Sequence, residues 1–173
     1  MSDRFLLYGA NGYTGSLIAH YGVQRGLHPI LAGRNSSQLE TLALSLGLKY
    51  KAFSLEDAAA VDAALLDVAA VLHCAGPFSS TSKPMVEACL RTQTHYLDIT
   101  GEVSVFEALA ALDAEAKSLG VMLLPGVGFD VGRRRARFDE RGQIGRAADG
   151  FDLTFAAQLL VNGHHVHRFA PVK

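Results

Sequence analysis

Phe5-Leu6-Leu7-Tyr8-Gly9-Ala10-Asn11-Gly12-Tyr13-Thr14-Gly15 is the stretch of this chain that decides its fold. A short apolar run, typical of a buried strand, leads directly into three glycines spaced three residues apart. Gly9 allows a tight turn off the strand, Gly12 lets an anionic ligand approach the backbone, and Gly15 lets the following helix pack against the strand. The pattern predicts a strand, a loop that holds phosphate, and a helix.

The helix after the third glycine is predicted over Ser16–Gln24, with Leu17, Ile18 and Tyr21 on one face. Its free N–H groups and the positive end of its dipole would face a bound pyrophosphate. Three glycines alone are equally typical of a turn without a ligand. Because a strand precedes them and a helix follows, we interpret the stretch as a nucleotide-binding loop.

The next strand and its loop indicate which nucleotide is bound. A second strand, Pro29–Ala32, ends in Gly33–Ser37, and Arg34 lies about 20 residues beyond the last glycine of the first loop. A site for NAD usually has an acidic residue here, which binds the ribose 2′-hydroxyl. A guanidinium followed by two serine hydroxyls would instead accept a 2′-phosphate through charge-assisted hydrogen bonds. The sequence therefore predicts NADP rather than NAD.

Two simpler roles are also open for this loop. Arg34 would be an ordinary solvated arginine, and Ser36 and Ser37 would cap the next helix. Ser37 and Glu40 have the spacing of a capping box. Capping and phosphate binding are compatible, because both use the same end of the helix.

Length and composition place the chain among globular proteins of one domain, or of one domain with a tail. It has 173 residues, 49% of them hydrophobic, and a formal net charge of −1. This charge gives no reason to expect nucleic acid as a partner, and no apolar run approaches the ~20 residues of a membrane span. Cys74 and Cys89 lack the spacing of a metal or redox site. The N-terminal apolar run is too short for a signal peptide, so we expect a cytoplasmic protein.

Strand and helix patterns alternate along the chain. The expected strands are Phe5–Tyr8, Pro29–Ala32, Leu48–Phe53, Ala69–Cys74, His95–Ile99 and Val121–Leu124. After the first helix, further helices are expected over Ser37–Leu46, Pro84–Thr92 and Val103–Leu119, and Ser54 is expected to cap another that runs through about Leu66. This alternation predicts an α/β fold, a Rossmann-like doubly wound parallel sheet of about six strands, followed by an atypical C-terminal tail. Ligands of such sheets bind beyond the carboxyl ends of the strands.

Five motifs occur in the order found in one oxidoreductase family. They are Gly9–Gly15, Leu31–Arg34, Cys74–Phe78, Tyr96–Glu102 and Pro125–Asp130. Together, over roughly residues 1–131, they resemble the NADP-binding domain of the saccharopine dehydrogenase-like oxidoreductases. That group includes saccharopine reductases and the trans-acting enoyl reductases of lipid biosynthesis. The resemblance implies that Ala75–Phe78 runs beside the nicotinamide half of the cofactor, and that a separate, sheet-rich substrate domain follows.

The candidate cofactor-binding residues come from three loops at the carboxyl edge of the predicted sheet. They are Gly9, Asn11, Gly12, Tyr13, Thr14, Gly15, Arg34, Asn35, Ser36, Cys74, Ala75, Gly76, Pro77 and Phe78. We expect no metal site and assign no catalytic residue, because hydride chemistry belongs to the cofactor. Two interpretations of Asp98, Thr100 and Glu102 stay open: they orient substrate or carry a proton, or they satisfy backbone N–H groups at a helix start.

The resemblance ends at Val131. We therefore divide the chain into an NADP-binding domain, residues 1–131, and an arginine-rich tail, residues 132–173, which is too short for a substrate domain. Arginines gather over residues 133–137. A fragment or frame-shifted product with a disordered tail, a shortened protein with an ordered cap, and an anion-binding patch would each explain them. The histidines of the tail, His164, His165 and His167, lack partner ligands at a fixed spacing, so we interpret them as solvated.

Two function classes stay open. One is an NADP-dependent oxidoreductase, or a part of one, with an unidentified small-molecule or lipid-type substrate. The other is a non-catalytic module that senses NADP. A short-chain dehydrogenase is disfavoured, because none of the five tyrosines is followed by lysine four residues later. A homo-oligomer is compatible with either class.

Overall fold

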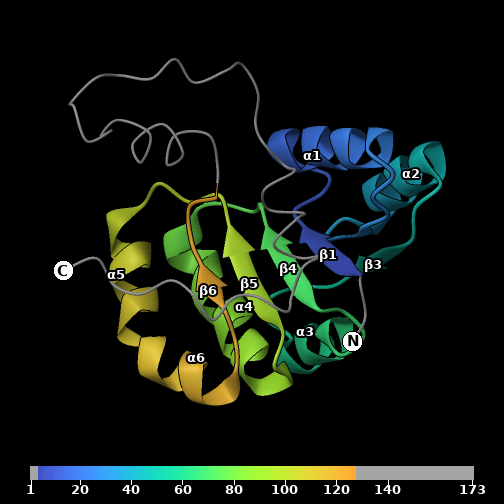
Figure 1. Cartoon of the computed structure of the whole chain (residues 1–173). Helices are drawn as coiled ribbons and strands as arrows, with labels where there is room; N and C mark the ends of the chain where they lie inside the picture. Colours follow the sequence, from blue (N-terminus) through green and yellow to red (C-terminus); the bar gives the residue numbers. More distant parts are fainter. Residues whose placement is uncertain (1–3, 128–173) are drawn as a thin grey trace, which may run out of the picture.

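A computed structural model of the chain describes residues 4–127 (Figure 1). Within them, six parallel strands form one sheet in the order β3-β2-β1-β4-β5-β6. The strands are β1 (Phe5–Tyr8), β2 (Ile30–Gly33), β3 (Tyr50–Ala52), β4 (Ala70–His73), β5 (His95–Asp98) and β6 (Leu123–Leu124). The helices are α1 (Tyr13–Gln24), α2 (Ser36–Leu46), α3 (Ala58–Leu65), α4 (Phe78–Thr92), α5 (Val103–Ala111) and α6 (Asp113–Leu119). The predicted Rossmann-like parallel sheet is confirmed.

The order of the strands reverses between β1 and β4. β1 pairs with β2 on one side and with β4 on the other, so that Leu7 lies level with both Leu31 and Leu72. The chain runs outward from β1 to β3, returns to β4 beside β1, and continues outward to β6. The loops that leave β1 and β4 therefore diverge, and sheets of this kind bind ligands in the crevice between such loops.

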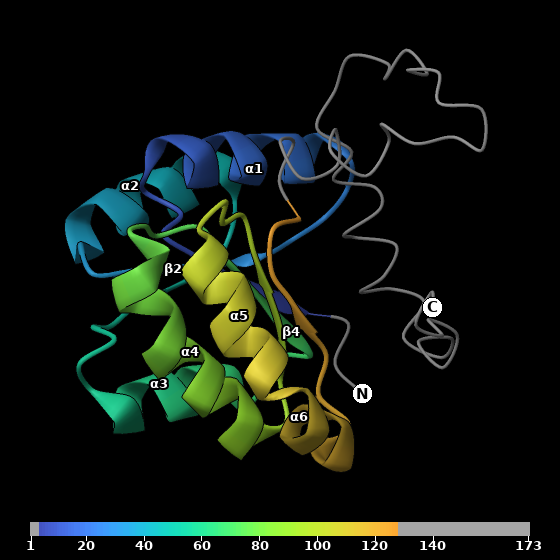
Figure 2. The same ribbon diagram turned by 90° about the vertical axis from the view of Figure 1, so that its left-hand side faces the viewer.

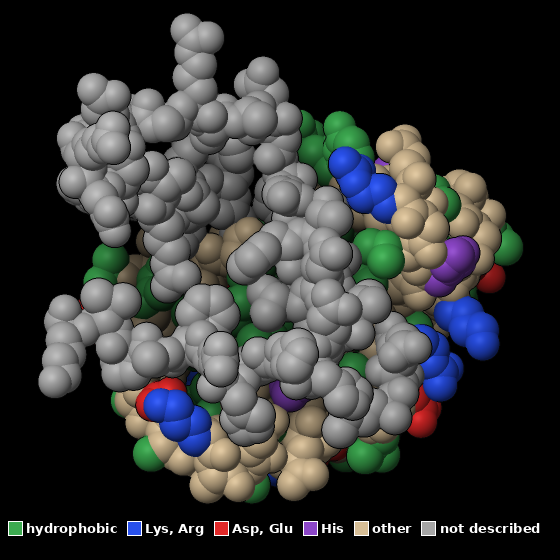
Figure 3. All heavy atoms as spheres, in the orientation of Figure 1, with side chains coloured by type: hydrophobic (Ala, Val, Ile, Leu, Met, Phe, Trp, Pro, Cys, Tyr) green, Lys and Arg blue, Asp and Glu red, His purple; other side chains and the backbone are tan. Residues whose placement is uncertain are grey.

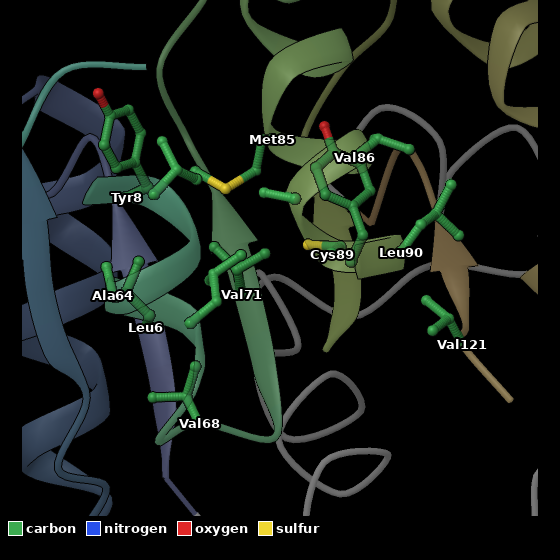
Figure 4. Close-up of a cluster of buried hydrophobic side chains, with 14 of the residues drawn as sticks. Leu6, Tyr8, Ala64, Val68, Val71, Met85, Val86, Cys89, Leu90 and Val121 are labelled. Carbon is green, nitrogen blue, oxygen red and sulfur yellow. The ribbon is translucent and has the colours of Figure 1, made fainter. Parts of the chain in front are cut away.

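Alternate residues of the strands supply two hydrophobic layers. Leu7 belongs to one buried cluster with Ile18 of α1 and Leu39 of α2. Leu6 belongs to the cluster on the opposite face, where side chains such as Met85 of α4 close the core (Figure 4). On that face α3, α4 and α5 lie side by side (Figure 2). Helices thus cover both faces, which explains the nearly continuous apolar sequences of the strands.

The largest differences from the predicted helix boundaries are at the start of α4 and at Leu112. The fourth helix is predicted to begin at Pro84, but α4 begins at Phe78 and contains Pro84. Pro84 removes one hydrogen bond of the helix, a local cost that the packing of the helix overcomes. The predicted helix over residues 103–119 is divided at Leu112, whose backbone leaves the helical region. Its N–H donates to the carbonyl of Leu109, three residues earlier, instead of continuing the α-helical pattern. The sequence has no glycine or proline there to indicate the break.

Two predicted N-caps are also wrong. Asn35, not Ser37, caps α2, since its side-chain oxygen accepts a hydrogen bond from the backbone N–H of Gln38. Asp57, not Ser54, caps α3. In both places the sequence offers two good capping residues close together, and only the direction of the incoming chain selects between them.

The packing face of α1 also differs from the prediction. Leu17 and Tyr21 are 43% and 50% exposed, whereas the predicted core residue Ile18 is buried. The other buried residues of α1 are small: Gly15, Ala19 and Gly22. Small residues let the helix axis approach the sheet closely, so the sheet contacts a narrow strip of α1 and leaves the large side chains outside.

The surface of the described part carries mixed charge on the face shown in Figure 3, with basic, acidic and hydrophobic side chains interspersed. Among residues 4–127, no helix combines the length and the apolarity that crossing a membrane requires. Several predictions fall outside the described residues: the end of the last motif at 128–130, the division at Val131, the arginines of 133–137, and the tail histidines His164, His165 and His167.

Candidate functional site

The glycine loop after β1 has one glycine that the fold leaves free for a ligand. Gly9 has φ +82°, and a Cβ on it would lie 2.9 Å from the backbone nitrogen of Ala75. A Cβ on Gly15 would overlap the carbonyl oxygen of Gly9. A Cβ on Gly12 would meet only that same carbonyl oxygen, at 3.2 Å. Gly9 and Gly15 are therefore required by the packing of the loop itself, and Gly12 lines an open groove.

The N-terminus of α1 opens at this loop. Gly12 is the N-cap of the helix, and within residues 4–127 no capping side chain forms a hydrogen bond with the first turn. Most helices satisfy these groups with a capping side chain. At α1 these N–H groups are able to bind an anion, and the dipole of the helix favours negative charge at the same point.

A groove of about 970 Å³ lies at the carboxyl edge of the sheet, between the loops that follow β1, β2 and β4. Its lining contains nine of the predicted cofactor-binding residues: Gly9, Asn11, Gly12, Arg34, Asn35, Ser36, Cys74, Ala75 and Gly76. Segments more than sixty residues apart in sequence thus line one groove. The structure brings together most of the predicted site.

Five predicted residues do not line this groove: Tyr13, Thr14, Gly15, Pro77 and Phe78. Tyr13 is 84% exposed at the start of α1, and Gly15 is buried beneath Gly9. Phe78 is buried and packs its ring edge-on against His73, with ring centres 5.4 Å apart. Among the described residues, Phe78 is therefore a buried anchor of its loop.

Four lining residues are outside the predicted list: Tyr8, Gly33, Ser37 and Gln38. Gly33 and Ser37 belong to the predicted ribose loop, whereas nothing in the sequence analysis singled out Tyr8 or Gln38. Tyr8 is the last residue of β1, and burial raises the pKa of its phenol although the nearby guanidinium of Arg34 acts in the opposite sense. Gln38 lies in the first turn of α2, directly after the predicted ribose loop. Its position four residues after Arg34 could have indicated that Gln38 lines the groove, because residues of the first helical turn reach back over the loop before them.

Arg34 is exposed at the end of β2 and lines the groove. Among residues 4–127 no carboxylate forms an ion pair with it. The part of the lining that the structure describes contains Arg34 and no acidic residue. A guanidinium beside a groove without a counter-charge can accept an anionic group of a ligand.

The loops after β1 and β2 are joined by their side chains. The Asn11 amide nitrogen donates a hydrogen bond to the side-chain oxygen of Gln38, 2.8 Å away. The Asn11 side-chain oxygen lies against Gly33, so close that a Cβ on Gly33 would be 2.7 Å from it. Asn35 holds the start of α2, since its side-chain oxygen accepts from the Gln38 N–H and from the Ser37 hydroxyl.

The loop after β4 is held by two polar side chains. Thr81 donates from its hydroxyl to the carbonyl oxygens of Ala75, at 2.6 Å, and Pro77, at 3.0 Å. The Glu102 carboxylate accepts hydrogen bonds from the backbone N–H groups of Phe78, at 2.7 Å, and Ser79, at 2.9 Å. A hydrogen bond from the Ser79 side chain, together with these two backbone hydrogen bonds, holds the pKa of Glu102 below its usual range.

The remaining acidic residue of the Tyr96–Glu102 motif is also bound to the protein. Asp98 is buried and accepts hydrogen bonds from the Tyr96 hydroxyl and from the backbone N–H groups of Thr100 and Gly126. Burial raises the pKa of Asp98, and the three hydrogen bonds oppose that rise. Thr100 in turn accepts from the Glu102 N–H. Of the two interpretations of this motif, these contacts favour a structural role.

Cys74 is a further titratable residue of the described lining. Burial, together with the charge of Asp98, raises its pKa to about 12. Within the described part of the chain, no three His, Cys, Asp or Glu side chains are grouped so that they could hold a metal ion.

A family profile covers the same part of the chain as the sheet. The profile of the saccharopine dehydrogenase NADP binding domain matches residues 5–124, which run from the start of β1 to the end of β6. The chain belongs to this family. The members are NAD(P)-dependent oxidoreductases, and the matched segment is their NADP-binding domain. The resemblance predicted from the five motifs is thus confirmed.

Individual relatives agree with this membership. The chain is 34% identical over 133 residues to a trans-acting enoyl reductase of Mycobacterium leprae, and 31% identical to one of Mycobacterium tuberculosis. Each alignment covers 72% of this chain and 32% of the relative, so the chain spans about a third of the length of these proteins. Among solved structures, saccharopine dehydrogenase from Saccharomyces cerevisiae shares the fold, with a TM-score of 0.66 and 22% identity. That match covers 76% of this chain and 28% of the yeast enzyme.

Proposed function

We propose that the chain binds NADP(H) in the groove at the carboxyl edge of the sheet. In this arrangement the pyrophosphate lies at the N-terminus of α1, over Gly12. The ribose 2′-phosphate lies at Arg34, Asn35 and Ser36, and the nicotinamide half extends toward Cys74–Phe78. The observation that carries the proposal is that, among residues 4–127, the guanidinium of Arg34 has no ion-pair partner and the groove lining has no carboxylate.

The residues present fit this ligand. Gly12 leaves space where a side chain would stand, and the uncapped first turn of α1 supplies N–H donors for phosphate oxygens. An acidic residue that would bind a free 2′-hydroxyl, and repel a 2′-phosphate, is missing from the described lining. These features favour NADP over NAD.

The chemistry that follows from bound NADPH is hydride transfer. The residues of this chain would bind the cofactor and orient it: Thr81 and Glu102 fix the loop along its nicotinamide half, and Arg34 selects its 2′-phosphate. The two curated relatives are named as enoyl reductases, so an enoyl compound is the substrate class to test first. Because the chain spans about a third of those proteins, hydride transfer by this chain is part of the proposal.

The first experiment is calorimetric titration of the purified chain with NADPH and with NADH. We expect tighter binding of NADPH, and Arg34→Asp should weaken it by about 1–3 kcal/mol, the scale of a charge-assisted hydrogen bond. Arg25→Asp is the matched control, because Arg25 follows α1 at its far end, outside the groove lining, and is equally charged. Equal affinity of the unmutated chain for NADPH and NADH would contradict the NADP assignment.

A second function, sensing of NADP(H) without turnover, has one observation in its favour. Asp98 and Glu102, the acidic residues nearest the β4 loop in the motif, are already engaged with backbone N–H groups. Absorbance at the NADPH band, followed with an enoyl acyl compound present, separates the two functions. Oxidation of NADPH supports the reductase, and saturable binding without oxidation supports the sensor.

A further inference from the structure

The side chains of Asn11 and Gln38 form a bridge between the two loops that flank the adenosine end of the groove. Asn11 follows β1 and Gln38 lies in the first turn of α2, and 27 residues separate them in sequence. Both are exposed, and both line the groove beside Arg34 and Ser36. We call this hydrogen-bonded pair the Asn11–Gln38 bridge.

The hydrogen bond between the two side chains relates the directions in which their amides face. Asn11 lies with its oxygen against Gly33, and its nitrogen donates to Gln38. The Gln38 oxygen is therefore occupied, and its backbone N–H is held by the Asn35 side chain. The amide nitrogen of Gln38, with two N–H donors, forms no hydrogen bond with the side chains and backbone of residues 4–127.

We infer that Gln38 is a specificity-determining residue for the 2′-phosphate of NADP(H), and that Asn11 is the positioning residue that turns its N–H donors toward that phosphate. The inference rests on the proposed function. Gln38 and Arg34 both line the groove from the β2–α2 segment, four residues apart, so a phosphate at Arg34 would be close to the free donors of Gln38. A ribose without the 2′-phosphate would not engage them. Gly33 supports the Asn11–Gln38 bridge, since any larger residue at this position would displace the Asn11 oxygen.

The decisive variant is Gln38→Glu. A glutamate keeps the oxygen that accepts from Asn11, so the bridge survives, but it replaces the free N–H donors by a negatively charged oxygen. The loss of a hydrogen bond to a charged group, together with repulsion of the phosphate, should weaken NADPH at least about tenfold. Binding of NADH should change by less than about threefold, because the altered atom faces only the 2′-phosphate.

Two further variants test the positioning role and the charge. Asn11→Ala removes the donor that orients Gln38 and should lower the ratio of NADPH to NADH affinity, by a smaller factor than Gln38→Glu. Gln24→Glu is the matched control, since Gln24 is exposed at the end of α1 and lies outside the groove lining. Circular dichroism and the melting temperature of each variant show that it is folded.

The outcomes separate this inference from the proposed function. The inference is supported if the unmutated chain prefers NADPH, Gln38→Glu removes that preference and Gln24→Glu keeps it. If Gln38→Glu keeps the preference while Arg34→Asp loses it, the proposed function stands and the role of Gln38 is wrong. If Gln24→Glu loses as much NADPH affinity as Gln38→Glu, the change in net charge explains the loss, and the inference is overturned. A chain that binds neither nucleotide overturns both.

Discussion

The carboxylate of Glu102 caps helix α4 by accepting a hydrogen bond from the backbone N–H of Phe78, 2.7 Å away, although 24 residues separate the two in sequence. A second carboxylate oxygen accepts from Ser79. The β5–α5 loop thus holds the first turn of α4, and through it the Cys74–Phe78 loop beside the groove. A negative charge at a helix N-terminus is favourable both as a hydrogen-bond acceptor and toward the helix dipole.

Replacing Glu102 should make the fold less sensitive to acid. The pKa of Glu102 lies below its usual value, so its contribution to stability is complete above about pH 4.5 and is lost as pH falls through the lower pKa of the folded state. Glu102→Gln should lower the melting temperature at neutral pH and flatten its decline in acid. Thermal melts between pH 3 and pH 7 measure this. Glu107→Gln, on an exposed position of α5, should leave the decline as it is.

His73 should supply a second acid-sensitive contribution, at higher pH. Its ring is buried between aromatic side chains, and burial lowers its pKa to about 3. The unfolded chain takes up a proton near pH 6.5 and the folded chain does not, so stability falls as pH drops from 6.5 toward 3. The slope should reach at most about 1.4 kcal/mol per pH unit.

Urea unfolding at a series of pH values measures that slope. His73→Gln should reduce it across the range from pH 6.5 to pH 4, because glutamine does not titrate. The exposed His20 serves as the control, and His20→Gln should keep the slope of the unmutated chain. An unchanged slope in His73→Gln would mean that other groups cause the loss of stability.

The capping of α2 can be tested with two neighbouring alanine variants. Asn35→Ala removes the acceptor for the Gln38 N–H and should lower the free energy of unfolding by about 1 kcal/mol. Ser37→Ala removes only a hydroxyl that donates to Asn35, and its effect should stay within about 0.5 kcal/mol. Denaturant unfolding of both variants decides the point. A larger loss of unfolding free energy in Ser37→Ala than in Asn35→Ala would instead support the capping box that the sequence suggested.

Two glycines of the first loop should differ in how much stability their replacement by alanine costs. Gly15→Ala places a Cβ against the backbone of Gly9 and Ala10, which cannot yield, and should cost about 1–3 kcal/mol of stability. Gly12→Ala meets a single atom at 3.2 Å and should cost less than about 1 kcal/mol.

Binding should show the reverse order for these two variants. The methyl group that Gly12→Ala adds enters the groove where the pyrophosphate is proposed to lie. The variant should therefore bind NADPH more weakly, while its melting temperature changes little. Calorimetry and thermal melts on the same preparations test both halves. Normal NADPH binding by a folded Gly12→Ala variant would make Gly12 a turn residue only.

The sequence by itself determined the α/β class, the six strands, and most of the candidate groove. The reason is that these features depend on short-range patterns: apolar runs for strands buried on both faces, glycines where the chain turns, and the shared carboxyl edge of a parallel sheet. Arg34 could be singled out because its distance from the glycine loop is a property of the βαβ unit. The family match over residues 5–124 spans the same six strands.

Only the tertiary structure decided how side chains from distant segments meet. Glu102 starts α4 ahead of Pro84, and Gln38 reaches Asn11. Neither contact is encoded in local periodicity, since each joins residues more than twenty positions apart. The exposure of Leu17 on α1 has the same origin, because small residues set the distance between that helix and the sheet. Long-range hydrogen bonds and close packing exist only once the sheet has brought its loops to one edge.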